Sequence, residues 1–170
     1  MVTSIIILVI IIALLVFQRP IGKLRTAALL VTLGTAGLLE HPGFSIIFAL
    51  RWGVVPEALH LVLTDHSRVH FFMAGVYALI ALALIVFIAW TGLLHGQRTA
   101  WFAIFGAYIV GGAAELLAGS FIFQHGFPLY APFGTPIRGY NWQFLYMYLV
   151  AWPVALVVSF RPIFGKRDET

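Results

Sequence analysis

Histidine side chains are the groups of this sequence best suited to chemistry, because five of the six are expected on the same side of a membrane. They are His41, His60, His66, His70 and His125. Neutral imidazoles bind copper, iron and zinc and serve as axial ligands of haem, and nearby carboxylates can orient such ligands. The pattern predicts a metal or haem site at the outer face. Its alternative is an interfacial loop in which the histidines only form hydrogen bonds.

The strongest candidate is the run Asp65-His66-Ser67-Arg68-Val69-His70, where a helix is predicted to begin. His66 and His70 are four residues apart, so they share a helix face and can chelate one metal ion. Asp65 is the candidate carboxylate ligand, and His60 precedes this helix. In the alternative interpretation, Asp65 caps the helix and the histidines lie at the level of the lipid headgroups.

A haem site would use the same residues differently, with two histidines from separate segments as axial ligands. His70 would then pair with His41 or with His125. These residues are predicted at the rim of the membrane, whereas haem ligands are more often expected within the span. The position therefore favours a metal ion over haem.

Two acids are candidate catalytic residues within predicted helices. Glu40 lies in the Glu40-His41-Pro42-Gly43 interruption of the second apolar segment, and Glu115 lies deep in the fourth. Small residues four positions apart around Glu115 indicate a close helix contact, so this acid is predicted to face the bundle interior. Glu115 is interpreted either as a proton-carrying or ligand-binding acid, or as a structural hydrogen-bonding group. Glu40, with His41, is interpreted either as facing a polar cavity within the outer half of the bilayer, or as an ordinary helix terminus at the water boundary.

Aromatic residues of the last apolar segment, Tyr146 and Trp152, are candidate walls of a pocket for a quinone, sterol or carotenoid. The alternative is ordinary helix packing. Pro153 follows Trp152 near mid-segment and is expected to kink the helix and free a backbone carbonyl there.

The last two segments and their loop resemble emopamil-binding-type sterol isomerases, which are small multi-helix membrane proteins with acids and a tryptophan in an intramembrane pocket. The resemblance covers about a third of the chain. The sequence departs from that family because its third segment has no buried glutamate and Leu149 stands three residues before Trp152. No residue role is transferred from it.

Composition defines the class of protein more firmly than any motif. The 170 residues are 62% hydrophobic and 9% charged, whereas soluble domains have roughly 25% charged residues. The basic residues are too few for nucleic-acid binding and lie at segment ends. The absence of cysteine excludes thiolate ligands and a cysteine nucleophile. No phosphate-binding loop or hydrolase motif is present.

Five apolar segments approach the roughly 20 residues that cross a bilayer. We therefore predict one all-α membrane domain over residues 1–170, with a short interfacial helix in 51–68 and a Pro/Gly-rich outer loop in 124–141. The predicted helices are residues 2–18, 26–50 (kinked or broken near 40–43), 69–94, 99–123 and 142–160.

The basic residues orient these segments. With the N-terminus outside and the C-terminus in the cytoplasm, seven of the ten Lys and Arg residues fall inside, as the positive-inside rule requires. A bacterial inner membrane is the expected location. We predict a subunit of a larger membrane complex of redox type that carries the outer histidine site. The alternatives are a lipid-pocket enzyme or binder that uses Glu115 and Glu40, and a purely structural subunit.

Overall fold

The computed structural model describes residues 2–50, 65–121 and 142–165. Side chains are described for most of them, but not for Glu40, His41, Asp65, His66, Glu115 or Tyr146. The described chain is helical and contains no strand, so the predicted all-α class is confirmed. Its elements are α1 (Val2–Val16), α2 (Gln18–Ile21), α3 (Lys23–Leu38), α4 (Glu40–Leu50), α5 (Asp65–Ile88), η2 (Ala89–Leu93), α6 (Arg98–Phe121) and α7 (Trp142–Phe164).

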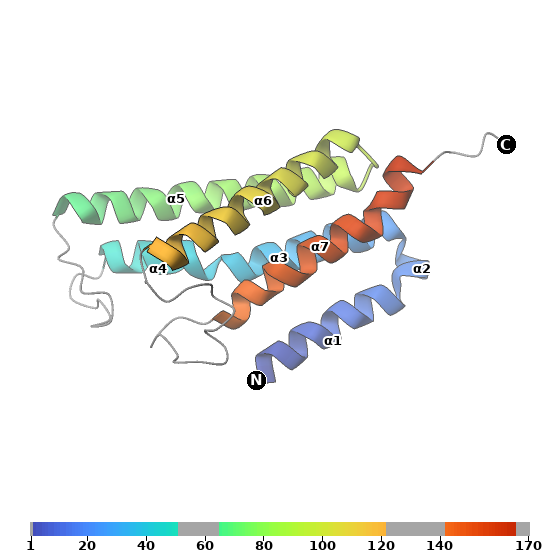
Figure 1. Cartoon of the computed structure of the whole chain (residues 1–170), viewed down its shortest axis with the longest axis horizontal. Coiled ribbons are helices and arrows are strands. Elements are labelled where there is room, and N and C mark those ends of the chain that lie inside the picture. Colours follow the sequence, from blue (N-terminus) through green and yellow to red (C-terminus); the bar gives the residue numbers. More distant parts are fainter. Residues whose placement is uncertain (1, 51–64, 122–141, 166–170) are drawn as a thin grey trace.

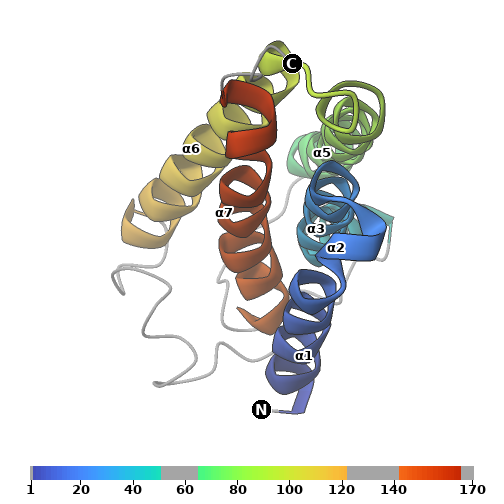
Figure 2. The same cartoon turned by 90° about the vertical axis from the view of Figure 1, so that its right-hand side faces the viewer.

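The long helices run up and down, so that their ends gather at two ends of an elongated bundle (Figure 1). One end holds α2, the start of α3, the turn from η2 to α6 and the last turn of α7. The other end holds the end of α4 and the start of α5. Figure 2 shows α6 and α1 at the periphery, on either side of α7 and α3.

The centre of the bundle is the pair α3 and α7, which pack on each other more extensively than any other two helices. Small residues line the buried face of each, and on α7 Ala151, Ala155 and Ser159 are fully buried at four-residue spacing. Small side chains let two helix backbones approach closely, and the resulting van der Waals contact stabilises helix pairs in apolar surroundings.

Residues 23–50 form a nearly continuous rod, in which α4 extends the line of α3 (Figure 1). Regular helix is interrupted only at Leu39, whose amide donates to the Ala36 carbonyl three residues back. Pro42 explains why the interruption occurs here, because its ring nitrogen has no hydrogen to donate to a carbonyl four residues earlier. The predicted break near 40–43 thus corresponds to an interruption one residue earlier.

α4 packs on α5 at a point where only glycine fits. A Cβ on Gly75 would lie 2.9 Å from the Pro42 carbonyl oxygen and 3.3 Å from the Ile46 backbone nitrogen. Because this contact involves backbone atoms, α4 and α5 are fixed in register there. α5 then continues through the π-helical turn η2 into a tight turn at Gly96, which has a positive φ of 72°.

One stretch of the described residues, Phe72–Leu93, is long and apolar enough to cross a membrane, and only 11% of it is buried. Tyr148–Phe164 is apolar but shorter. α1 contains 15 residues, and the second predicted segment is divided at Leu39. Helix length alone therefore does not establish the predicted five spans.

Candidate functional site

The predicted metal site lies at the start of α5, and only part of it is described. α5 begins at Asp65, so the backbones of His66 and His70 are one helical turn apart, as the predicted chelating pair requires. The side chain of His70 is exposed. His60 and His125 lie outside the described residues. Among the side chains that are described, no group of three or more potential metal ligands occurs.

The register of α4 against α5 sets His41 apart from this pair. Gly75 lies opposite Pro42 and Ile46, and the two helices are antiparallel (Figure 1). His41 is therefore opposite a point beyond Gly75, whereas His70 precedes Gly75 by more than one turn. At 1.5 Å per residue the two backbones are roughly 12 Å apart along the bundle. Glu40 and His41 accordingly lie in the body of the rod formed by α3 and α4, not at its end.

Glu115 lies in α6, one turn beyond a close contact with α7. A Cβ on Gly111 would come within 2.9 Å of the Tyr148 hydroxyl oxygen, and that hydroxyl donates to the Tyr108 carbonyl at 2.7 Å. Gly111 therefore makes room for the tip of the Tyr148 side chain, and the predicted close approach of helices around Glu115 stays a prediction. The side chains of Glu115 and Tyr146 lie outside the described residues, and their roles stay predictions.

Trp152 lies within the α3–α7 interface, with 2% of its surface exposed. Its indole nitrogen donates to the Val31 carbonyl at 3.1 Å, and the Thr35 hydroxyl donates to the same carbonyl at 2.8 Å. These contacts tie α7 to α3 at the centre of the bundle. The predicted role of Trp152 as the wall of a ligand pocket is not visible among them and stays a prediction.

The carbonyl expected to be freed by Pro153 is that of Leu149, four residues earlier. The Tyr108 hydroxyl lies 3.5 Å from this oxygen and donates to it. The rings of Tyr108 and Tyr148 are 5.2 Å apart. The two tyrosines therefore join α6 to α7 at the point where Pro153 leaves an acceptor free.

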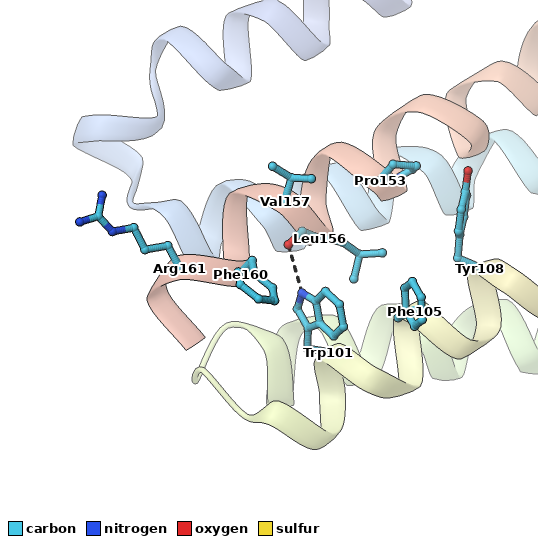
Figure 3. Close-up of a pocket in the computed structure, with 8 residues that line it drawn as sticks. All are labelled: Trp101, Phe105, Tyr108, Pro153, Leu156, Val157, Phe160 and Arg161. Atoms are coloured by element: carbon cyan, nitrogen blue, oxygen red, sulfur yellow. Dashed lines mark hydrogen bonds between the residues drawn. The ribbon is translucent and has the colours of Figure 1, made fainter. Parts of the chain in front are cut away.

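An apolar groove of about 420 Å³ separates α6 from α7 on the side toward the C-terminal end of α7 (Figure 3). α6 contributes Trp101, Phe105 and Tyr108 to its walls. α7 contributes Pro153, Leu156, Val157, Phe160 and Arg161.

This groove was not predicted from the sequence. The signal that would have indicated it is an aromatic stripe on the fourth predicted helix, since Trp101, Phe105 and Tyr108 follow at spacings of four and three. Trp101 and Phe105 stack with ring centroids 5.3 Å apart. Periodicity shows that these rings share a face, but it does not show which helix they meet.

Comparison with known proteins provides no relative from which a function follows. No protein-family model, no curated protein and no solved structure matches the chain.

Proposed function

We propose that this protein is a multi-pass integral membrane subunit that crosses the bilayer five times and works within a larger membrane complex. The observation that carries the proposal is the exposure of large apolar side chains along the outer helices. In α5, Leu79, Ile80, Leu84 and Phe87 are 38%, 53%, 55% and 62% exposed. A soluble protein would leave such a continuous apolar surface in contact with water, whereas a bilayer solvates it.

The placement of charge supports the same proposal. The described Lys and Arg side chains belong to α2, the first turn of α3, the start of α6 and the last turn of α7, which meet at one end of the bundle (Figure 1). These residues are Arg19, Lys23, Arg25, Arg98 and Arg161. By the positive-inside rule this end faces the cytoplasm. The N-terminus is then outside and the C-terminus inside, in a bacterial inner membrane.

The absence of cysteine makes topology directly testable. Single substitutions Gln97→Cys, in the η2–α6 turn, and Thr64→Cys, before α5, are compared in intact cells with a membrane-impermeant maleimide. We expect Thr64→Cys to be labelled from outside and Gln97→Cys only after lysis. Labelling of both from the same side would contradict an odd number of crossings between them. Release of the chain by alkaline carbonate would contradict membrane integration itself.

Association with other subunits follows from the open packing at the bundle's edge. α1 and α6 contact α7 much less extensively than α3 does, and both carry exposed apolar side chains such as Ile12 and Val110. We expect gentle detergent extraction to yield a complex larger than the 18.8 kDa chain. Recovery of a monodisperse single chain under those conditions would contradict the role as a subunit and indicate a membrane protein that acts alone.

A metal site at the outer face is the second part of the proposal. The start of α5 at Asp65 favours it, because His66 and His70 are then one turn apart on a regular helix. His60, His125 and Asp65 are the candidate further ligands, and copper, iron, zinc or haem iron the candidate metals. Such a centre would give the complex a redox or metal-dependent activity.

Elemental analysis and a visible spectrum of the purified complex test this site. We expect about one equivalent of metal or a haem band, lost in His66→Ala and His70→Ala. His95→Ala is the matched control, because His95 is exposed in the turn between η2 and α6, and that turn lies at the opposite, basic end (Figure 1). A metal-free, colourless wild-type complex, or equal loss in the His95→Ala control, would contradict the site.

A further inference from the structure

The groove between α6 and α7 is held open by its own aromatic side chains. The Trp101 indole nitrogen donates to the Leu156 carbonyl at 3.1 Å, and the Tyr148 hydroxyl donates to the Tyr108 carbonyl at 2.7 Å. Each contact spans the two helices through a long side chain. α6 packs on α7 much less extensively than α3 does, and the space between the two contacts is left as the groove.

The walls of the groove offer a ligand almost no polar partner. The Trp101 N–H already donates to the Leu156 carbonyl, and the Tyr108 hydroxyl already donates to the Leu149 carbonyl. Arg161 is the charged residue of the wall. The other remaining wall residues have hydrocarbon side chains and are Phe105, Pro153, Leu156, Val157 and Phe160. A molecule that fits this groove is therefore a hydrocarbon along its length, and the volume of about 420 Å³ lies within the roughly 300–1,000 Å³ of small-molecule sites.

The charge at one end of the groove defines the other part of the ligand. Figure 3 shows Arg161 at one end of the groove, next to Phe160 and then Trp101, with its guanidinium extending away from the two rings. Arg98 lies nearby in the same aromatic cluster, 5.5 Å above the ring of Phe164, which in turn is 5.3 Å from Trp101. Arg161 and Arg98 place two positive charges at this end, and positive charges attract an anion.

We propose that the groove binds one acyl chain of an anionic phospholipid from the inner leaflet, with the lipid phosphate at Arg161 and Arg98. The apolar walls of the groove match the acyl chain of such a lipid, and the two arginines at its end match the phosphate that follows the chain. Basic side chains at a bilayer surface attract anionic lipids, and an arginine binds phosphate through several N–H groups. This proposal rests on the membrane integration proposed above.

Native mass spectrometry of the detergent-extracted complex tests the site, with phosphatidylglycerol and phosphatidylcholine of identical acyl chains added in equal amounts. We expect one retained phosphatidylglycerol per chain, with about a fivefold preference contributed by each arginine. Arg161→Gln should lower the preference about fivefold, and Arg19→Gln, at the same end but outside the groove, should leave it unchanged. Val157→Trp should fill the groove and abolish retention of either lipid.

Val150→Trp is the matched control for groove filling, since Val150 is an exposed α7 residue that does not line the groove. Equal retention of the two lipids by the wild type, or unchanged retention in Val157→Trp, would overturn the proposal. Crosslinking of the cysteine in Val157→Cys to another protein, with no lipid bound in the groove, would also overturn the proposal. Recovery of the chain in the aqueous fraction before detergent extraction would instead contradict membrane integration. Failure of the lipid site and failure of membrane integration are therefore distinguishable.

Discussion

The two faces of α7 show how the same helix forms a sealed interface on one side and an open groove on the other. Toward α3 most of its residues are small, with Ala151, Ala155 and Ser159 fully buried beside Trp152. Toward α6 they are large, and Trp101 and Phe105 of α6 stack against each other in front of Leu156 and Phe160. Small residues bring helix backbones together, whereas rigid rings set a minimum distance between them.

Polar groups follow the same division. The Trp152–Val31 hydrogen bond lies inside the α3–α7 interface, where the indole is 2% exposed. Two of the bonds that join α6 to α7, from Trp101 to Leu156 and from Tyr108 to Leu149, involve half-buried side chains at the groove, whereas the donor of the third, Tyr148, is buried. The α3–α7 interface is therefore the most extensive contact of the described helices, and the open one is the surface that we propose binds a lipid.

Enlarging a residue in the sealed interface should have the largest effect. We expect Ala155→Leu to lower the free energy of unfolding by about 1–3 kcal/mol, because overpacking forces neighbouring helices apart. Val157→Leu is the control, since Val157 is 74% exposed on the groove side, and its effect should stay within about 0.5 kcal/mol. Denaturation by SDS in mixed micelles measures both. Equal effects would show that α3 and α7 are not tightly packed.

A smaller effect is expected where α6 approaches α7. Gly111→Ala places a methyl group against the Tyr148 hydroxyl, whereas Gly112→Ala meets nothing within 4 Å. Both variants gain helix propensity, so the difference between them isolates the contact. We expect Gly111→Ala to be less stable than Gly112→Ala by about 1 kcal/mol. In a Tyr148→Phe background the difference should shrink, and an unchanged difference would rule out this contact as its cause.

The smallest effect concerns the hydrogen bond at the bundle centre. Trp152→Phe removes the donor to Val31, but Thr35 still donates to that carbonyl. We expect the lost hydrogen bond to cost about 0.6 kcal/mol, the average for hydrogen bonds between helices in membranes, and the volume lost at this buried position to add to that cost. Trp90→Phe is the matched control, because its indole bonds Thr32 at an exposed position. A larger loss of stability in Trp90→Phe than in Trp152→Phe would contradict the assignment of the Trp152–Val31 bond as the central contact.

The helices were predictable from the sequence, because each apolar run is long and bounded by glycine, proline or charge. The predicted 99–123 and 142–160 correspond to α6 (Arg98–Phe121) and α7 (Trp142–Phe164). The gathering of the described basic residues at one end also follows from the alternation of helix direction. Neither result requires knowledge of which helices touch.

The pairing of helices was not predictable. The 3.6-residue period identifies the face that carries Trp101, Phe105 and Tyr108, but not the neighbour of that face. The same limit applies to the histidines: only the contact of Gly75 with Pro42 and Ile46 sets the backbone of His41 about 12 Å from that of His70 along the bundle. The role of His41 as a ligand stays a prediction, because its side chain lies outside the described residues.

The most direct test of the central claim, that the exposed apolar surface of α5 contacts lipid, is a nitroxide at Leu84→Cys in reconstituted bilayers. Leu84 is 55% exposed near the middle of Phe72–Leu93. We expect frequent collisions with dissolved oxygen and few with a water-soluble nickel complex, and the reverse for His95→Cys in the basic turn. More frequent collisions of the Leu84→Cys label with the nickel complex than with oxygen would contradict the account.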